Sequence, residues 1–329
     1  MTGKAPRGLG RPERVLFLRL GKLGDMMVTA CLFEAARRAL PGARLGLVTL
    51  PRSLEYSRAL PELDQVHAWR PATLPWLALR LRGRWDWMVD LNELPSSRSR
   101  LARNLFKPGR TAVFRGTGAR ADLVMDAPPK ERSHVLDRMA SASRALGFRA
   151  PAGLFRPRVP LDAGRLSRAR ARAAAGLGVA LNLSAGHPSR YWPLDRWQAL
   201  ALALLKADAR LTLQILHDRR DSALAQRLER ALPAGRCRPA GGPGLWDFLE
   251  DIASNRLLIS PDTSAVHAAC GLGVPVLGLY PEPAWNLASW GPRGPGHRAL
   301  RSPQGGLESL PLEPVRAAAL GMLKRLRHP

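Results

Sequence analysis

Cysteine is scarce in this sequence: the 329 residues include only Cys31, Cys237 and Cys270. No two of them are close in the chain and none belongs to a CxxC pair, which excludes a disulfide framework and a zinc-binding motif. Cys31 and Cys270 fall in apolar segments with helical periodicity. We therefore expect both to be ordinary buried thiols.

The chain also lacks a long apolar run. Its first apolar segment, residues 15–18, has only the length of a strand, and no stretch of about 20 apolar residues follows. Residues 1–13 are basic and rich in glycine and proline, but the apolar core of a signal peptide is missing. We expect a cytoplasmic protein that does not span a membrane, while a peripheral contact with the inner membrane stays open.

Acidic residues are few: 26 stand against 51 basic ones, which gives a formal net charge of +25. Such a chain favours anionic partners, namely nucleic acid, an acidic membrane surface or a phosphorylated substrate. An arginine-rich solvated surface would give the same charge, so composition alone does not choose among them. Aromatic residues are not interleaved with the basic ones and no helix-turn-helix pattern is present, so we expect no nucleic acid partner.

What is present is enough apolar sequence for two domains. Hydrophobic residues make up 46% of a chain that is too long for one ordinary α/β domain of roughly 100–200 residues. Short β-type runs alternate with helix-length segments, which is typical of parallel sheets. The predicted strands cover residues 15–18, 45–49, 87–91, 111–114, 179–183, 211–216, 257–259 and 274–279.

These patterns predict the α/β class, with two doubly wound parallel sheets of Rossmann-like type that face a cleft. A segment rich in proline and glycine, residues 148–160, is the expected linker. We therefore place one domain at 1–160 and a second at 161–310. Residues 311–329 follow as a C-terminal helix.

The first candidate site is the turn GKLGD, residues 21–25, which follows the first predicted strand. Ligands of open α/β sheets bind at this end of the strands, and the two glycines allow close approach to a ligand. The turn is neither GxGxxG nor a P-loop, so neither a dinucleotide nor ATP is indicated. Asp25 has two interpretations: an N-cap of the next helix, or a general base that takes a proton from a hydroxyl.

The second candidate is SPDTSAVH, residues 260–267, again between a strand and a helix. Its free N–H groups and the helix dipole would favour a phosphate. Asp262, Thr263 and Ser264 could each cap the helix, and His267 is either packed or in contact with a ligand.

The third candidate is the loop after the strand at 179–183. Ser184 and the glycine that follows allow close backbone approach, and Arg190 could pair with a phosphate. Trp192 and Pro193 are expected to begin the next helix and to pack under the loop.

Taken together, four segments resemble glycosyltransferase family 9, the lipopolysaccharide heptosyltransferases. They are RLGKLGD (19–25), SAGHPSRYWPLDRW (184–197), SPDTSAVHAACGLGVPVLGLY (260–280) and PEPAWNLASWGP (281–292), and HVLDR (134–138) also resembles a family segment. The resemblance implies a GT-B fold, with an acceptor-binding N-terminal domain and a nucleotide-sugar-binding C-terminal domain. It also implies inverting transfer of a heptose from ADP-heptose to an anionic, lipid-linked inner-core acceptor, without metal or cofactor.

The resemblance also assigns roles to residues. Asp25 matches the family's base, and Arg190, where many members have Lys, matches a contact to the donor phosphate. Asp262, Thr263 and His267 match the rest of the donor site. Ser264 departs from the family pattern because the family usually has Gly there.

A second departure is the HDRR segment, residues 217–220, which replaces a glycine-containing turn. Asp218 is therefore a candidate for an acidic donor contact. Lys22 and Arg52 are candidates for binding an anionic acceptor. The alternatives that stay open are a GT-B transferase with another nucleotide sugar, a basic nucleic-acid-binding protein, and a catalytically silent member of the family.

Overall fold

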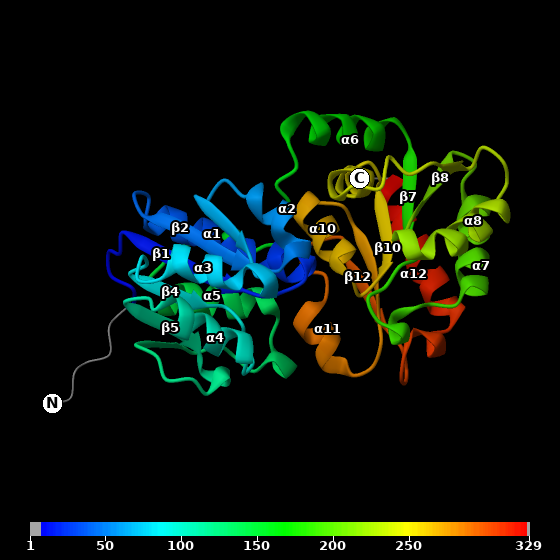
Figure 1. The fold of residues 1–329 in the computed structure, drawn as a ribbon. Helices are drawn as coiled ribbons and strands as arrows, with labels where there is room; N and C mark the ends of the chain where they lie inside the picture. The colour runs from blue at the N-terminus through cyan, green and yellow to red at the C-terminus, as the bar shows by residue number, and fades with distance from the viewer. Residues whose placement is uncertain (1–7, 328–329) are drawn as a thin grey trace. The chain divides into compact units, whose positions relative to one another are not determined.

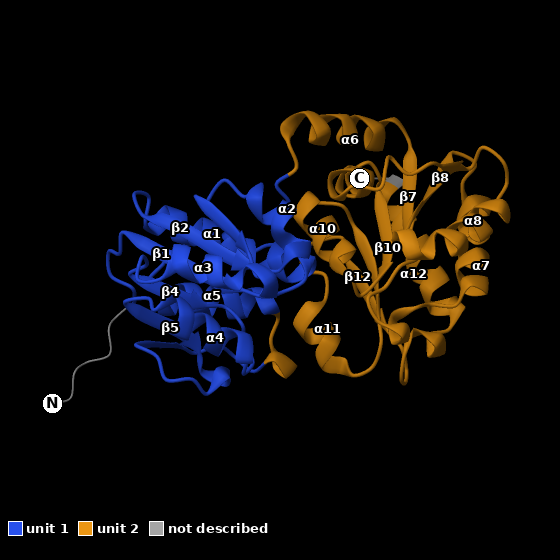
Figure 2. Ribbon diagram, in the orientation of Figure 1, with its two compact units in different colours: residues 1–129, 135–160 blue, residues 130–134, 161–329 orange. Residues whose placement is uncertain are grey.

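The computed structural model describes residues 8–327, which form two compact units. The first unit holds residues 8–129 and 135–160, and the second holds 130–134 and 161–327 (Figure 2). Within residues 8–327, no helix has both the length and the apolar character needed to cross a membrane.

The first unit is built on a six-stranded sheet in the order β3-β2-β1-β4-β5-β6, all parallel (Figure 1). Its strands are β1 (Arg14–Arg19), β2 (Arg44–Thr49), β3 (Gln65–Ala68), β4 (Trp87–Asp90), β5 (Arg110–Phe114) and β6 (Leu123–Met125). The order reverses between β1 and β4, so the carboxyl ends of these two strands are where a ligand crevice is expected.

Helices cover both faces of this sheet. They are α1 (Leu23–Ala39), α2 (Leu54–Arg58), α3 (Leu74–Leu81), α4 (Ser97–Phe106) and α5 (Val135–Ala145). Helices α1 and α5 pack together, and α3 contacts α4. Leu77 and Leu81 of α3 and Phe106 of α4 share one buried cluster with Leu16 and Leu18 of β1.

The second unit repeats this plan, with strand order β12-β11-β10-β7-β8-β9, again all parallel. Its strands are β7 (Leu177–Asn182), β8 (Leu211–Leu216), β9 (Cys237–Arg238), β10 (Leu257–Pro261), β11 (Val276–Tyr280) and β12 (Arg298–Arg301). Here the order reverses between β7 and β10. The predicted α/β class with two doubly wound parallel sheets is confirmed.

The helices of the second unit are α6 (Ala163–Ala175), α7 (Leu194–Ala207), α8 (Ser222–Arg230), α9 (Leu245–Ala253), α10 (Ser264–Leu272), α11 (Ala284–Trp290) and α12 (Leu312–Arg327). The C-terminal helix α12 packs against α7 and contributes Val315 and Met322 to the same core as Trp197. Trp192 is buried in this core, and its Nε1 donates to the Leu310 carbonyl oxygen at 2.9 Å. Trp192 and Pro193 directly precede α7, which begins at Leu194 with Pro193 as its N-cap.

The expectation that Cys31 and Cys270 are both buried thiols is confirmed for one of them. Cys31 is fully buried, and burial raises the pKa of its thiol to about 12. Cys270 is only partly buried, so the expectation of a buried thiol is wrong there. It lies in the last turns of α10, where the helix reaches the surface, and desolvation still raises its pKa to about 11.

Candidate active site

Asp25 lies in the first turn of α1, directly after β1. Its Oδ2 accepts a hydrogen bond from the backbone N–H of Lys22 at 2.7 Å, and its Oδ1 accepts one from Arg19 at 3.1 Å. The N-cap of α1 is Lys22, so Asp25 is not the N-cap itself; it caps the helix from the third helical position, through its bond to the Lys22 N–H. The side chain of Asp25 keeps 25% of its surface exposed, which leaves the carboxylate accessible to a substrate.

Arg19, which was not singled out from the sequence, holds this carboxylate in place. Its side chain is only 7% exposed, and its other terminal nitrogen donates to the backbone oxygen of Leu91, just beyond β4. The guanidinium therefore joins the carboxyl ends of β1 and β4 and fixes the orientation of Asp25. The sequence signal for it was an arginine at the last position of a buried strand.

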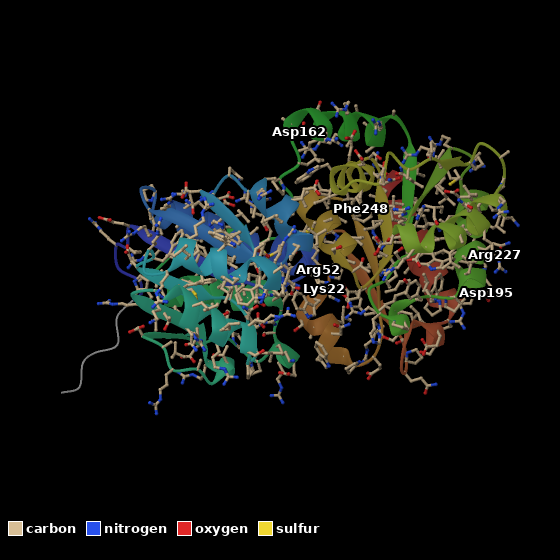
Figure 3. All side chains as sticks on the ribbon, viewed as in Figure 1. Lys22, Arg52, Asp162, Asp195, Arg227 and Phe248 are labelled. Carbon is tan, nitrogen blue, oxygen red and sulfur yellow. The ribbon has the colours of Figure 1, made fainter. Side chains whose placement is uncertain are left out.

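Lys22 and Arg52 lie at the same end of the first sheet. The Ser53 hydroxyl in the turn after β2 donates to the Gly21 carbonyl oxygen at 3.1 Å and so links their two turns. Figure 3 labels both residues in the same region of the first unit. Both residues are exposed, and neither side chain has a hydrogen bond or an ion pair with a residue in the described range 8–327.

Asp90 ends β4, directly beside Leu18 of β1. The residue is fully buried; its Oδ1 accepts hydrogen bonds from the backbone N–H and the side-chain amide of Asn92, at 3.0 and 2.8 Å. Its Oδ2 has no hydrogen-bond partner among the described residues. Burial raises the pKa of this carboxyl above its ordinary value.

We expect the substitution Asp90→Asn to stabilise the protein more at neutral pH than at acid pH. A carboxyl whose pKa is raised on folding contributes stability below the unfolded pKa of about 4, and this contribution is lost as the pH rises through the folded pKa. The amide does not titrate, so the free energy of unfolding of the variant should rise relative to that of the wild type as the pH increases. Urea unfolding of both proteins at several pH values checks this, and a pH-independent difference would contradict it.

In the second unit, Asn182 joins the carboxyl ends of the central strands β7 and β10. Its side-chain amide donates to the Ser260 hydroxyl at 3.0 Å and to the Thr263 hydroxyl at 3.2 Å. Thr263 is the N-cap of α10, and its hydroxyl also accepts from the backbone N–H of Ala265 at 3.3 Å. Of the three residues that could cap this helix, Thr263 is the one that does.

Asp262 and Arg190 form an ion pair beside this helix end. One terminal nitrogen of Arg190 lies 3.2 Å from Asp262 Oδ2 and donates to the Asp262 carbonyl oxygen at 3.0 Å. Asp262 is buried, and its Oδ2 also accepts from the Asn286 amide at 2.7 Å. The Arg190 side chain is 32% exposed, so its guanidinium is anchored on one side and accessible to an anion on the other.

Ser264 and His267 belong to the first turns of α10. Ser264 is the first helical residue and is half-buried. His267 is 5% exposed and packs against Trp290, with the ring centroids 5.9 Å apart. The packed interpretation of His267 is thus confirmed, whereas its contact with a ligand stays a prediction.

Ser184 holds together the loops after β7 and β8. Its hydroxyl donates to Asp221 at 2.5 Å and accepts from the backbone N–H of Asp218 at 2.7 Å. Tyr191 donates to the same carboxylate at 3.1 Å, and desolvation together with this bond raises the pKa of the phenol. The side chain of Asp218 is 66% exposed and lies 3.4 Å from Arg220.

The candidate residues therefore gather at two sheet edges. The carboxyl edge of the second sheet collects the donor-site candidates: Ser184, Arg190, Asp218, Asp262, Thr263, Ser264 and His267. The carboxyl edge of the first sheet collects Asp25, Lys22 and Arg52. Asp221, Tyr191 and Asn286 were missed in the sequence, because only the fold brings them to Ser184 and Asp262.

Comparison with models of protein families identifies the family of this chain. The family model of glycosyltransferase family 9 (heptosyltransferase) matches residues 77–303, which is more than half of the chain. The chain belongs to glycosyltransferase family 9. The matched range includes every donor-site candidate, whereas Asp25, Lys22 and Arg52 precede it.

Solved structures show the same fold. ADP-heptose lipopolysaccharide heptosyltransferase II from E. coli is 18% identical, with a TM-score of 0.74 over 95% of this chain and 98% of that one. A family 9 glycosyltransferase from Veillonella parvula is 17% identical, with a TM-score of 0.77 over 95% and 98%. E. coli heptosyltransferase WaaC with ADP is 16% identical, with a TM-score of 0.72 over 94% and 99%.

No curated protein matches the sequence significantly. Because the chain belongs to a family of glycosyltransferases, it is an enzyme, as the resemblance of its motifs implied. The GT-B fold expected from that resemblance is confirmed by the solved structures.

Proposed function

We propose that this glycosyltransferase moves a heptose from ADP-heptose to an anionic, lipid-linked acceptor of the lipopolysaccharide inner core, with inversion and without metal or cofactor. The observation that carries the proposal is the carboxyl edge of the second sheet. There, the anchored guanidinium of Arg190 and the N-terminus of α10 are both held at the Asp262–Thr263 turn. A cation beside free helical N–H groups is suited to a diphosphate.

In the proposed reaction, Asp25 takes the proton of the acceptor hydroxyl while its oxygen attacks the anomeric carbon of the donor. The bond from that carbon to the diphosphate breaks, and ADP leaves with the electron pair. Arg190 and the N-terminus of α10 stabilise the negative charge that develops on the leaving group. Arg19 keeps the Asp25 carboxylate oriented for proton transfer.

Lys22 and Arg52 are suited to an acceptor that carries phosphate or acidic sugars, because both cations are exposed beside Asp25. The net charge of +25 is compatible with an enzyme that works at an anionic membrane on its cytoplasmic side. Asp218, with its exposed carboxylate, is the candidate contact to the polar part of the donor. Ser184, Ser264 and His267 complete the proposed donor site.

A second candidate function is transfer from a different nucleotide sugar. It is favoured by Ser264, whose side chain adds atoms at a helix end where the family usually has glycine. It is also favoured by the ion pair between Asp218 and Arg220 in the loop after β8, because this pair engages the carboxylate that is the candidate donor contact.

A donor panel tests the proposal. We expect calorimetry to show that ADP-heptose binds more tightly than GDP-, UDP- and dTDP-sugars, and that ADP alone retains most of that affinity. ADP release should then require an inner-core acceptor. Preference for another nucleotide would select the second candidate, and binding of nucleic acid without any nucleotide sugar would refute both.

A further inference from the structure

The first unit contains a pocket at the amino edge of its sheet, opposite the edge that holds Asp25. The volume of the pocket is about 410 Å³, which lies in the range of small-molecule sites. Its walls come from the first residues of three strands and from the C-terminal end of α3. The lining residues are Arg14, Arg44, Gln65, Arg80, Leu81, Arg84 and Trp85.

Four arginines line this pocket, and no carboxylate does. Arg14 and Arg44 are register partners at the start of β1 and β2, so their side chains begin next to each other. Arg14 pairs with Asp86 at 2.9 Å, whereas Arg80 and Arg84 have no side-chain hydrogen bond or ion pair with any residue in the described range 8–327. At least two guanidinium groups are thus available to an anion, for which bidentate phosphate contacts are the preferred geometry.

Neighbouring groups neutralise this charge only in part, through the pair of Arg14 with Asp86. Arg44 is engaged by the neutral amide of Gln65, whose oxygen accepts from Nε at 2.9 Å in the orientation that satisfies both groups. Burial lowers the pKa of His67 on β3, and Arg80, Arg58 and Arg44 lower it further. Besides Asp86, the nearby carboxylates are those of Glu13, which is exposed, and Asp64, which is already paired with Arg37 at 2.7 Å.

The helix that supplies Arg80 also presents large apolar side chains to solvent. Trp76 is 74% exposed and Leu79 is 69% exposed, and no other large hydrophobic side chain among the described residues is as exposed as these two. Positions 76, 79 and 80 share one face of α3, because they are three and four residues apart. An exposed apolar pair therefore continues directly into the arginine pocket.

We infer that this face of α3 and the adjoining arginine pocket form a binding surface for a membrane that contains anionic phospholipids. Trp76 and Leu79 enter the boundary between headgroups and acyl chains, as the apolar face of an interfacial helix does. Arg80, Arg84 and their neighbours in the pocket bind lipid phosphates. A nucleic acid would use the same cations but would leave Leu79 in water, so the apolar pair favours the membrane.

This inference goes beyond the proposed function, because it assigns a surface to membrane binding and does not depend on the donor or the acceptor. The experiment uses the purified full chain and vesicles of phosphatidylcholine with or without phosphatidylglycerol, read by cosedimentation. Two double variants are compared with the wild type: Trp76→Ser with Leu79→Ser, and Arg80→Gln with Arg84→Gln. Matched controls are Leu202→Ser with Leu224→Ser, and Arg170→Gln with Arg227→Gln, all at exposed positions of the second unit.

We expect the wild type to bind only the vesicles that contain phosphatidylglycerol. The arginine pair should weaken binding at least about 25-fold, because each cation near an anionic surface contributes about fivefold. The apolar pair should weaken it about tenfold or more, and the control pairs should leave it nearly unchanged. Circular dichroism and nucleotide binding should stay unchanged in all variants, so loss of vesicle binding is separable from failure of the proposed function.

Three results would overturn the inference. The first is wild-type binding that does not depend on phosphatidylglycerol. The second is a loss caused by the arginine pair alone, with the apolar pair inert, which is the pattern expected of a polyanion such as nucleic acid. The third is saturable binding of inorganic phosphate or pyrophosphate in the pocket without any vesicle binding, which would assign the pocket to a free phosphate compound.

Discussion

Replacing Asp25 by asparagine is expected to lower kcat about 10²- to 10⁴-fold, the range that a positioned general base contributes. The amide keeps the shape of the side chain, and its oxygen can still accept from the Lys22 N–H. It cannot take a proton from an acceptor hydroxyl. ADP release with the inner-core acceptor measures turnover, and calorimetry with ADP-heptose measures donor binding.

Donor affinity should change little, because every donor-site candidate belongs to the second unit. The substitution also removes the charge that faces Arg19, so unfolding must be measured in parallel. The hydrogen bond from the Lys22 N–H is kept, so the loss is confined to the charge of the ion pair with Arg19, and we expect the protein to stay folded. The variant Arg19→Lys serves as a control that keeps both the base and a cation. If Asp25→Asn retains a third or more of wild-type turnover, Asp25 is not the base.

The sequence predicted the interior of both sheets and missed their edges. The four strands that had no prediction are β3, β6, β9 and β12, and these are the outermost strands of the two sheets. An interior parallel strand is buried on both faces and reads as a continuous apolar run, as β1 and β7 do. An edge strand is partly exposed: every residue of β3 (QVHA) is only half-buried, and β12 (RALR) begins and ends with exposed arginines.

For the site, too, the local motifs were predictable from the sequence, whereas contacts between residues far apart in the chain were not. The strand-turn-helix patterns at residues 21–25 and 260–267 located the sheet edges correctly, because the carboxyl ends of parallel strands are recognisable from the strand itself. The partners were not recognisable. Asp262 and Arg190 are 72 positions apart, and Asp262 meets Asn286 only because the chain returns along β11. The sequence offered Arg190 as a possible phosphate contact, and the fold adds its buried anchor at Asp262.

Replacing Arg190 by alanine is expected to weaken ADP and ADP-heptose binding about 10- to 100-fold. This factor corresponds to one charge-assisted hydrogen bond of about 1.5–3 kcal/mol between the guanidinium and a donor phosphate. The substitution also removes the Arg190 guanidinium from Asp262, so the carboxylate would repel the diphosphate more strongly. Calorimetry with ADP, ADP-heptose and adenosine measures the effect, and adenosine should lose almost no affinity because it carries no phosphate.

The two contributions to this loss can be separated with Asp262→Asn. The double variant Arg190→Ala with Asp262→Asn lacks the repelling carboxylate but also lacks the phosphate contact of Arg190. Its affinity for ADP should therefore recover only in part. Arg190→Lys keeps the charge and should fall between wild type and Arg190→Ala, since a point cation lacks the planar geometry that reaches Asp262 and a phosphate together. Full recovery in the double variant would mean that Arg190 acts only by neutralising Asp262. Equal losses for ADP and adenosine would mean that Arg190 shapes the loop and does not contact a phosphate.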